Sequence, residues 1–509
     1  METKTAAIEM RNITKRFGPV LANDKVWLNI YRGEILALLG ENGSGKTTLM
    51  NMLSGIYFPD EGEIKIDGKE VVICSPKDAF DNGIGMIHQH FKLVDVLTAA
   101  ENIVLGLPGK LDLKAASAKI REICDKYGFS VDPAQKIYDM SVSQKQTVEI
   151  VKVLYRGADI LILDEPTAVL TPQETDKLFA VLRNMRNDGK AIVIITHKMH
   201  EVEALSDRVA ILRHGQFIGD MLTAHTNAQE MTNMMVGHAV SLNIERPDPV
   251  DPKPRIEVKG LTVRSVDGIV KLDDVSFTAN SGEILGIAGI SGCGQKELLE
   301  AIAGLQTVES GSISYIEDDG SREELIGKDP LSIAELGVSL SFVPEDRLGM
   351  GLVGNMNLAD NMMLRSFRRG KSIFTDRRSP RALAESVVQE LSVSTPSVDT
   401  PVRRLSGGNV QKVLVGREIA SAPTVLLTAY AVRGLDIHSS YTIYDLINRQ
   451  KKAGVAVIFV GEDLDVLLEL CDRILVLCGG KVSGIVSGRG AEKREVGMMM
   501  TKLGGQSHE

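Results

Sequence analysis

The feature that most constrains this 509-residue chain is an internal repeat of about 250 residues. The segment Gly33–Leu36 recurs as Gly282–Leu285 at an offset of 249, and the glycines that follow each segment recur at the same offset. Further along, Met140-Ser141 matches Leu405-Ser406 at an offset of 265, so the second copy contains 16 additional residues. A period of this length is far too long for a solenoid and predicts two homologous domains.

The boundary between the copies falls in a proline-rich segment. Four prolines occur in the ten residues Glu245–Pro254, which favours a stiff, extended connection. We therefore predict a first domain at residues 6–243, a linker at 244–255 and a second domain at 256–505. The alternative, an irregular loop inside a single domain, is disfavoured because matched segments lie on both sides.

Within each copy, short β-branched runs alternate with amphipathic stretches. Residues 34–39, 159–163 and 191–195 are continuous apolar runs of strand length. Such runs are typical of parallel strands that are covered on both faces, and helical patterns separate them. The fold class is therefore α/β with a mostly parallel sheet, in which ligands bind at the carboxyl ends of the strands.

The first copy contains a phosphate-binding sequence. Gly40–Thr47 fits G-x(4)-G-K-[ST], follows an apolar strand and precedes the helical pattern Thr48–Leu53. Its glycines allow backbone amides to surround phosphates, and the helix amino end adds favourable partial charge. We expect Lys46 to reach the β- and γ-phosphates and the Thr47 hydroxyl to hold Mg²⁺.

A second segment supplies the acidic groups that such a site needs. Residues 160–163 are an apolar strand that ends in Asp164 and Glu165. Asp164 suits the Mg²⁺ shell, and Glu165 is placed to orient and deprotonate a water molecule. An isolated Asp-Glu pair before a proline would be read as a surface turn, but the phosphate loop makes the functional interpretation the stronger one.

Composition narrows the class of partner. Lys and Arg number 58 against 67 Asp and Glu, a formal charge of −9, which disfavours nucleic acid as a partner. Aromatic residues make up only 4%, too few for base-stacking platforms, and no apolar run approaches the roughly 18–20 residues of a membrane helix. The five cysteines show no paired or metal-binding spacing, which indicates a reducing compartment.

Along nearly its whole length the chain resembles the ATPase subunits of ABC transporters. Gln89 stands where this family has a loop glutamine that contacts the γ-phosphate, Mg²⁺ and the membrane subunits, and His197 where it has a γ-phosphate contact. Phe17 stands where the family stacks an aromatic ring on adenine, and Leu405–Gln411 is close to the family signature. The resemblance implies two tandem P-loop domains, each with a RecA-like parallel core and a helical subdomain, arranged head to tail.

The motif match and the resemblance together assign the site residues. The predicted catalytic residues are Glu165, His197, Gln89 and Lys46. The predicted ATP contacts are Phe17, Gly40, Asn42, Gly43, Ser44, Gly45, Lys46, Thr47, Thr48, Ser406, Gly407, Gly408 and Gln411. The predicted Mg²⁺ ligands are Thr47, Gln89 and Asp164. The cofactors are therefore ATP and Mg²⁺.

The second copy has lost the catalytic groups in a coordinated manner. Gln295 and Lys296 replace Lys46 and Thr47, and Ala429 and Tyr430 replace the two carboxylates. Two further replacements, on the same alignment, are Glu345 for Gln89 and Glu462 for His197. The first copy has an altered signature in turn, with Ser143 in place of a glycine.

The head-to-tail arrangement of the family explains this sorting of defects. Each ATP would lie between the phosphate loop of one domain and the signature of the other. One site would combine the intact groups of the first copy with Ser406–Gly408, and the other would combine the two altered sets. We predict one catalytic site and one site that at most binds nucleotide.

A narrower resemblance concerns the transported substrate. Val343–Arg347 and Arg433–Asp436 are similar to fused double-ATPase subunits of simple-sugar importers. Residues 88–106, 394–400 and 462–465 resemble nucleoside importers that use basic-membrane-protein-type binding lipoproteins. Ala431-Val432, where the family has Pro-Thr, and Ser143 depart from the nucleoside pattern, so a monosaccharide importer stays the alternative.

The resemblance also implies partners and location. They are two integral-membrane permease subunits and an extracytoplasmic substrate-binding lipoprotein, without nucleic acid, and the chain would be peripheral on the cytoplasmic face of the inner membrane. Contact with the membrane would be indirect, through the permeases. A soluble tandem ATPase acting on ribosomes or DNA is the alternative from a different class, and a regulator without turnover conflicts with the complete set of catalytic residues.

Overall fold

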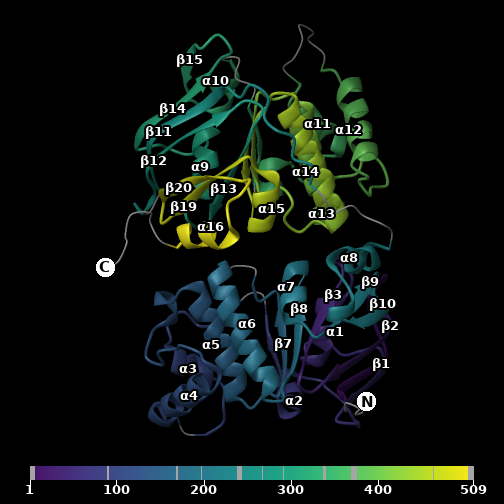
Figure 1. Ribbon diagram of the computed structural model, residues 1–509. Helices are drawn as coiled ribbons and strands as arrows, with labels where there is room; N and C mark the ends of the chain where they lie inside the picture. Colours follow the sequence, from purple (N-terminus) through teal and green to yellow (C-terminus); the bar gives the residue numbers. More distant parts are fainter. Residues whose placement is uncertain are drawn as a thin grey trace. The chain divides into compact units, whose positions relative to one another are not determined.

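The chain folds into two compact units with the same topology, residues 1–241 (unit 1) and 242–509 (unit 2). A computed structural model describes residues 6–88, 91–109, 111–167, 170–196, 198–237, 244–265, 268–290, 292–335, 340–344, 346–367, 375–461 and 463–501. Figure 1 shows that each unit contains its own sheets and helices. The repeat in the sequence therefore corresponds to a repeat in the fold.

A six-stranded sheet forms the centre of unit 1, in the order β10-β9-β3-β8-β7-β6. All neighbouring pairs are parallel except β9 and β10. The strands are β3 (Glu34–Leu39), β6 (Ile84–Ile87), β7 (Ile160–Asp164), β8 (Ala191–Ile195), β9 (Arg208–Arg213) and β10 (Gln216–Leu222). Every residue of β3 and β8 is buried, as expected for strands covered on both faces. The three predicted strands are confirmed.

A second sheet in unit 1 is antiparallel, in the order β2-β1-β4-β5. Its strands are β1 (Ala6–Phe17), β2 (Val20–Tyr31), β4 (Glu61–Ile66) and β5 (Lys69–Val71). Only one face of this sheet is buried over much of its length, so its strands alternate apolar and polar residues and give no continuous apolar run. The prediction from such runs therefore missed it.

Helices of unit 1 cover the parallel sheet and form a separate helical region. They are α1 (Lys46–Leu53), α2 (Pro76–Asp81), α3 (Ala99–Val104), α4 (Leu113–Tyr127), η1 (Ile137–Asp139), α5 (Val142–Tyr155), α6 (Pro172–Asn187), α7 (Met199–Leu205), η2 (Thr223–His225) and α8 (Ala228–Val236). α3, α4 and α5 share a small core around Ile103, Ile120 and Val148. This region is the predicted helical subdomain.

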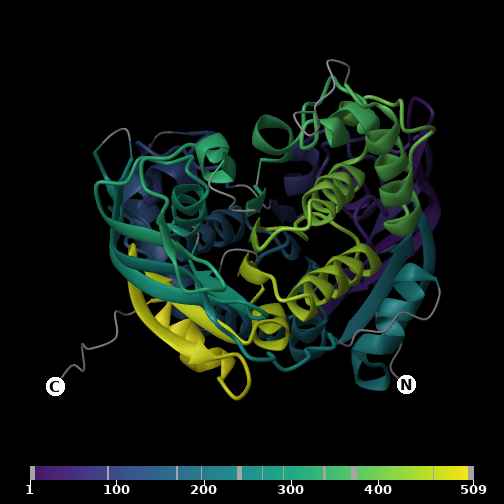
Figure 2. The same cartoon turned by 90° about the horizontal axis from the view of Figure 1, so that it is seen from above.

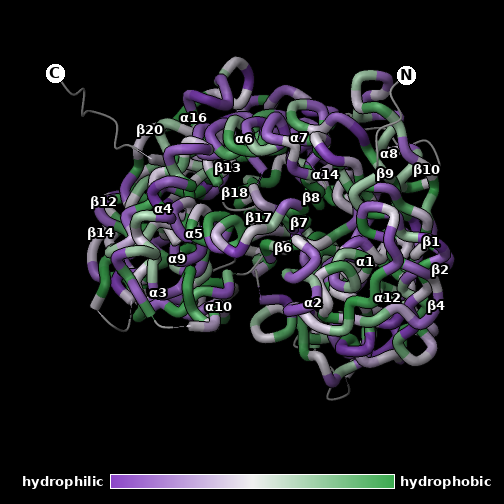
Figure 3. The backbone as a smooth tube through the Cα atoms, turned by 90° about the horizontal axis from the view of Figure 1, so that it is seen from below, coloured by the Kyte–Doolittle hydropathy of each residue, from purple (hydrophilic) through white to green (hydrophobic). Residues whose placement is uncertain are grey.

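Helix α6 shows how capping residues and an amphipathic pattern determine where a helix of this chain begins and which face it buries. Thr171 accepts a hydrogen bond from the amide of Glu174, whose carboxylate accepts one from the Thr171 amide, and Pro172 occupies the first helical position. Figure 3 shows hydrophilic and hydrophobic residues alternating along its turns. Its apolar face, which includes Leu182 and Met185, is buried.

Unit 2 repeats both sheets in the same order, β16-β17-β18-β13-β19-β20 and β12-β11-β14-β15. The strands are β11 (Pro254–Arg264), β12 (Val270–Asn280), β13 (Ile284–Gly289), β14 (Ser310–Ile316), β15 (Arg322–Glu324), β16 (Leu340–Val343), β17 (Val425–Ala429), β18 (Ala456–Val460), β19 (Arg473–Cys478) and β20 (Lys481–Ser487). The teal β12 lies against the yellow β20, which joins the two sheets of the unit (Figures 1 and 2).

The helices of unit 2 follow the same plan. They are α9 (Gln295–Ile302), α10 (Pro330–Glu335), the π-helical turn η3 (Arg347–Gly351), α11 (Leu358–Met363), α12 (Arg378–Glu390), η4 (Val402–Arg404), α13 (Gly407–Ala420), α14 (Ile437–Lys452), α15 (Leu464–Leu470) and α16 (Lys493–Met499). α11, α12 and α13 belong to the large core of the unit, which includes Leu358, Ala384 and Val413.

The proline-rich segment before β11 is bound to unit 2. The Arg246 guanidinium donates to the carbonyl oxygens of Leu468 (2.8 Å) and Cys471 (2.5 Å). The ammonium of Lys451 is buried, donates to Asp472 (2.7 Å) and also donates to the carbonyl of Pro247. The segment is thus fixed at its amino-terminal end to α14 and to the end of α15.

Candidate nucleotide site

The loop between β3 and α1 has the conformation of a phosphate-binding loop. Gly43 and Gly45 have positive φ angles of 82° and 94°, and Gly45 is the N-cap of α1. A Cβ atom at Gly45 would lie 2.3 Å from the carbonyl oxygen of Ala22, so a side chain is excluded there. The amides at the start of α1 therefore point toward the loop, where an anion would be stabilised.

Lys46 lies within this loop and is already held by it. Its buried ammonium donates to the carbonyl oxygens of Gly40 (2.7 Å) and Glu41 (2.9 Å). Burial lowers the pKa of Lys46, and the charges of Glu165 and Asp164 oppose that shift. The lysine is therefore held as a cation at the loop, and its predicted contact with the β- and γ-phosphates stays a prediction.

Three other loop residues differ in accessibility. Asn42 and Thr47 are exposed, and Thr48 is half-buried. The Ser44 hydroxyl is buried and has no hydrogen-bond partner among the residues that the structure describes. A buried hydroxyl without a partner is costly, and a phosphate oxygen in the loop would supply one. The loop thus fits the group that its sequence predicts.

The two carboxylates lie at the end of β7, opposite the start of α1. The Thr47 hydroxyl is 3.4 Å from Asp164 Oδ2. Burial, with the charge of Glu165 as a second cause, raises the pKa of Asp164 to about 6, while Lys46 and Thr47 act in the opposite direction. The structure therefore brings Lys46, Thr47, Asp164 and Glu165 together, although more than a hundred residues separate the two pairs.

Glu165 is held in an uncommon backbone conformation. Its φ angle is 48°, in the left-handed region, and its amide donates to the carbonyl of Ile195 at the end of β8 (2.9 Å). Left-handed backbone at a residue other than glycine is costly and is often found at functional sites. This turn directs the chain away from the sheet immediately after Asp164.

The oxygen atoms at this position suit a magnesium ion. Thr47 Oγ1 and the carboxylate of Asp164 are hard donors of the kind that Mg²⁺ prefers. Burial raises the pKa of Asp164, and a divalent cation beside this carboxylate would stabilise its charged form. The residues present therefore fit the ion.

The aromatic residue predicted to contact adenine lies at the end of β1. Phe17 is 41% exposed and meets Tyr57 edge to face, with ring centroids 5.1 Å apart, and Lys15 Nζ lies 5.6 Å from its ring centre. Its open ring is available for stacking. Tyr57, which is 37% exposed, was not predicted, because nothing in the sequence spacing links residues 17 and 57.

The corresponding loop in unit 2 has a similar backbone conformation but lacks the lysine of the unit 1 loop. Gly292 and Gly294 have φ angles of 87° and 98°, close to those of Gly43 and Gly45. Gln295 is buried where Lys46 lies in unit 1, and its amide donates to the carbonyl of Ile290 (3.3 Å), so a neutral group replaces the ammonium.

In unit 2, strand β17 corresponds to β7, the strand that ends in Asp164. Its last residue, Ala429, is buried and replaces Asp164, and Tyr430 follows with a φ angle of 53°. The guanidinium of Arg433 lies 5.9 Å from the centre of the Tyr430 ring. The turn is retained without a carboxylate at either position.

The signature segment of unit 2 forms the amino end of α13. Ser406 is the N-cap and is exposed, Gly407 begins the helix, and Gly408 is half-buried. The Ser406 hydroxyl oxygen accepts hydrogen bonds from the amide nitrogen of Asn409 (3.4 Å) and from its side-chain amide (2.9 Å). The helix amino end and its serine therefore form an exposed anion-binding surface.

Gln411, a predicted nucleotide contact, lies inside unit 2. It is 1% exposed, and neither of its side-chain polar atoms has a hydrogen-bond partner among the described residues. In unit 1 the corresponding Gln146 donates to the carbonyl of Pro166 at 2.5 Å. Its burial was not predicted, because Gln411 lies only three residues after Gly408 in the signature segment.

In unit 1 the altered signature forms a capping box at the amino end of α5. The Ser141 hydroxyl accepts from the Gln144 amide (3.3 Å), and the Ser141 amide donates to the Gln144 side chain (2.8 Å). This capping box occupies groups that would otherwise be available to an anion. Four residues named in the sequence analysis lie outside the described residues: Gln89 and His197 of the first copy, and Glu345 and Glu462 of the second.

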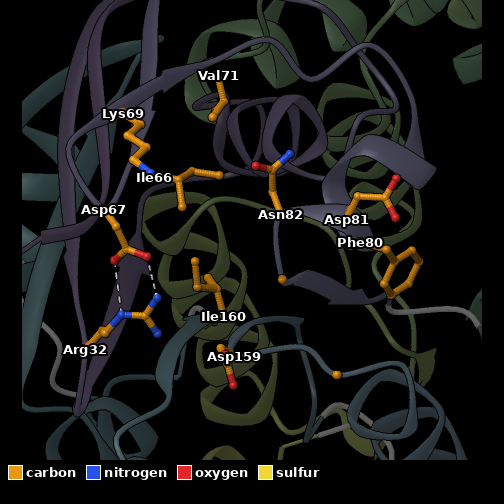
Figure 4. Close-up of a pocket in the computed structure, with 12 residues that line it drawn as sticks. Arg32, Ile66, Asp67, Lys69, Val71, Phe80, Asp81, Asn82, Asp159 and Ile160 are labelled. Carbon is orange, nitrogen blue, oxygen red and sulfur yellow. Dashed lines mark hydrogen bonds and ion pairs between the residues drawn. The ribbon is translucent and has the colours of Figure 1, made fainter.

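A cavity of 480 Å³ lies at the opposite edge of the unit 1 sheet, where β6 and β7 begin. Figure 4 shows Arg32 and Asp67 joined on one side of it by two hydrogen bonds, of 3.1 and 2.7 Å, and Asp81 and Asp159 also line it. None of the predicted site residues lines this cavity. It is therefore separate from the nucleotide site.

Comparison with known proteins agrees with this geometry. The family model described as "ABC transporter" matches residues 23–168 and 272–428. The nucleoside import ATP-binding protein NupA of Lactococcus lactis is 42% identical and is aligned over 99% of both chains. The glucose import ATP-binding protein TsgD13 of Haloferax volcanii is 39% identical over 98% of this chain and 96% of its own length. The guanosine import ATP-binding protein NupO of Bacillus subtilis is 40% identical over 97% of both.

Within the described residues, no helix is both long and apolar enough to cross a membrane. The family model matches once in each unit; the first match spans the phosphate loop, Asp164 and Glu165, and the second spans the counterpart loop and ends at residue 428. The chain is therefore a member of the ABC transporter family, a transport ATPase with two ABC ATPase domains.

Proposed function

We propose that this chain is the ATP-hydrolysing subunit of an importer for nucleosides. The observation that carries the proposal is its 42% identity to a nucleoside import ATP-binding protein over 99% of both chains. The similarity to a guanosine import protein at 40% identity supports the same substrate class. An importer for a monosaccharide is the second candidate, because a glucose import protein is 39% identical.

Turnover takes place at the unit 1 phosphate loop. Lys46 binds the β- and γ-phosphates, the loop amides surround them, and Glu165 accepts a proton from the attacking water. A Mg²⁺ ion held by Thr47, Asp164 and Gln89 would neutralise charge on the phosphate oxygens. The cluster of Lys46, Thr47, Asp164 and Glu165 supports this assignment.

The site is completed by Ser406, Gly407 and Gly408 from unit 2, whose amides and hydroxyl bind the γ-phosphate. The second site, formed by Gln295, Ala429 and Tyr430 with the capped Ser141, at most binds nucleotide. The assignment of catalysis to one site alone follows from the way in which intact and altered residues are distributed between the two units. Phe17 stacks on adenine, and His197 contacts the γ-phosphate.

The partners are two integral-membrane permease subunits and an extracytoplasmic substrate-binding lipoprotein. The chain binds the permeases at the cytoplasmic face of the inner membrane. The loops that contain Gln89 and Glu345 transmit to the permeases the conformational change that ATP binding causes. The import ATP-binding relatives support this class of partner. A tandem ATPase that acts on ribosomes or DNA is disfavoured by the same similarities, which extend over the whole chain.

Uptake in the native host tests both the role and the substrate. A strain lacking the chain should lose uptake of radiolabelled nucleosides, and the wild-type chain should restore it while the Glu165→Gln variant should not. Ribose and glucose uptake, measured in the same strains, should be unchanged. Loss of monosaccharide uptake with normal nucleoside uptake would establish the second candidate instead.

A further inference from the structure

We propose that Arg347 is a positioning residue that fixes the amino end of α13, and thereby the signature serine, for ATP hydrolysis. The inference rests on the proposed function, in which Ser406, Gly407 and Gly408 complete the catalytic site of unit 1. It adds a residue that acts through the signature helix and that belongs to the unit without catalytic carboxylates.

Arg347 joins three segments that are distant in the sequence. It lies four residues after the end of β16 and begins η3, and its side chain is half-buried. Its Nη1 atom donates to the carbonyl oxygen of Gly407 (3.0 Å), the first residue of α13. Its Nη2 atom donates to the carbonyl oxygen of Arg433 in the loop after β17. One guanidinium therefore connects the loop after β16, the loop after β17 and the signature helix.

The chemistry of the arginine suits this role. A guanidinium is planar and presents its donors in a fixed fork, so two hydrogen bonds define both the distance and the angle between their acceptors. A Cβ atom at Gly407 would lie 3.2 Å from Arg347 Nη1, closer than most side chains allow. The glycine at this position thus permits the guanidinium to approach the helix backbone.

A second contact fixes the serine itself. The Asn409 side chain donates to the Ser406 hydroxyl oxygen (2.9 Å) and accepts from the amide of Ser394 (3.0 Å). Because the Ser406 oxygen acts as an acceptor, its own proton remains available to donate to a phosphate oxygen. Asn409 therefore sets the direction of the hydroxyl, whereas Arg347 sets the position of the helix turn that bears it.

Unit 1 has a different residue at the position of Arg347. The fourth residue after β6 is Phe91, which has no side-chain hydrogen-bond donor. The signature helix of that unit is closed by Ser141 and Gln144 instead. The arginine contact is thus found in the unit whose signature sequence is intact, which points to a role in presenting that signature rather than in general stability.

The expected effect is on turnover and not on binding. Loss of the Arg347 contacts would let the first turn of α13 shift, and a displacement of about 1 Å in a group that binds the transition state lowers the rate about 100-fold. Lys46 and the loop amides, which bind the phosphates in the ground state, belong to unit 1, where Lys46 is held by carbonyl oxygens of its own loop. kcat should therefore fall while the affinity for ATP is preserved.

The experiment compares three variants of the full-length chain. We expect Arg347→Met to lower kcat about tenfold or more, with KM for ATP and the affinity for a fluorescent ATP analogue within about twofold of wild type. Arg347→Lys, which keeps a single donor group, should recover part of the rate. The matched control is Arg381→Met, because Arg381 forms an exposed ion pair with Asp399 in the same unit and its loss should not change kcat.

A double-mutant cycle with Ser406→Ala separates positioning from a structural role. If Arg347 acts through the signature serine, adding Arg347→Met to Ser406→Ala should lower kcat by much less than it does alone. Fully additive losses, or a normal kcat in Arg347→Met beside an impaired Ser406→Ala, would overturn the inference while leaving the proposed function intact. Normal turnover in Ser406→Ala itself would overturn the composite site and this inference together.

Discussion

Glu165 and Tyr430 have the same backbone conformation at corresponding positions of the two units. Their φ angles are 48° and 53°, and their amides donate to the carbonyl oxygens of Ile195 and Val460 at an identical distance of 2.9 Å. Tyr430 thus occupies the position of Glu165 and keeps the same costly left-handed backbone conformation. The backbone of this turn therefore does not depend on the carboxylate.

The first prediction concerns these two residues. Glu165→Gln should lower ATP turnover about 1,000-fold, because a general base contributes about 10²–10⁴ to the rate. Tyr430→Gln, the same new side chain at the corresponding backbone position, should retain turnover within about threefold. Phosphate release by the purified chain measures both. Residual turnover near half of wild type in Glu165→Gln would mean that both sites are catalytic.

The second prediction exchanges the residues at the two phosphate loops. Lys46→Gln should fold normally, because Gln295 already occupies the same buried position in unit 2. Its affinity for ATP should fall about 30-fold, since a charge-assisted hydrogen bond contributes about 1.5–3 kcal/mol. Isothermal titration with ATP gives the affinity, and circular dichroism melting checks the fold.

The reciprocal change, Gln295→Lys, is the control for this exchange. It restores an ammonium to unit 2 without a carboxylate at residue 429, so it should not increase the maximal rate of ATP turnover. An increase toward twice the wild-type rate would contradict the assignment of all turnover to unit 1.

The third prediction follows from the raised pKa of Asp164. Because that pKa lies near 6 in the folded chain against an ordinary value of 3.8, the folded state binds more protons between about pH 4 and pH 6. Stability without nucleotide or Mg²⁺ therefore falls as the pH rises through this window, and the cost is fully present above it. Asp164→Asn should abolish turnover and stabilise the chain by about 1–2 kcal/mol at pH 7.5, after discounting for partial exposure.

Urea unfolding in EDTA at three pH values checks this expectation. The stabilisation by Asp164→Asn should be largest at pH 7.5, smaller at pH 5 and absent near pH 4. Asp159→Asn, at the other end of the same strand and in an exposed ion pair with Lys190, should show no such gain. An equal stabilisation by Asp164→Asn at all pH values would show that ionisation is not the cause.

The fourth prediction tests the aromatic contact. Phe17→Ala should raise KM for ATP about tenfold with little change in kcat, because stacking of a base on an aromatic ring contributes about 1–3 kcal/mol to binding alone. Trp27→Ala removes another exposed aromatic residue, which is 49% exposed on the neighbouring strand β2, and should leave KM unchanged. Equal effects of the two substitutions would argue against a specific adenine contact.

Much of the fold was predictable because its signals are local. The strands at 34–39, 160–164 and 191–195 are buried on both faces and therefore appear as continuous apolar runs. The phosphate loop was predictable because its glycines and Lys46 lie within eight residues. The pairing of Thr47 with Asp164 followed from the rule that ligands bind at the carboxyl ends of parallel strands.

What the sequence did not reveal depends on contacts between distant residues. Arg347 reaches Gly407 and Arg433 across 60 and 86 residues, and Tyr57 meets Phe17 across 40. Gln411 was predicted to contact nucleotide from its place beside the signature, but whether a helical side chain faces solvent or core is decided by packing against other elements. Its predicted contact stays a prediction, as do those of Gln89 and His197.

The anchoring of the proline-rich segment determines how the chain can be divided. A fragment that begins at residue 256 would lose Pro247, whose carbonyl binds the buried Lys451, and Arg246, which caps the carbonyls at the end of α15. An ammonium at 1% exposure that loses one of its acceptors is destabilising. The second half of the protein should therefore be expressed from residue 242, because the proline-rich segment is part of its folded unit.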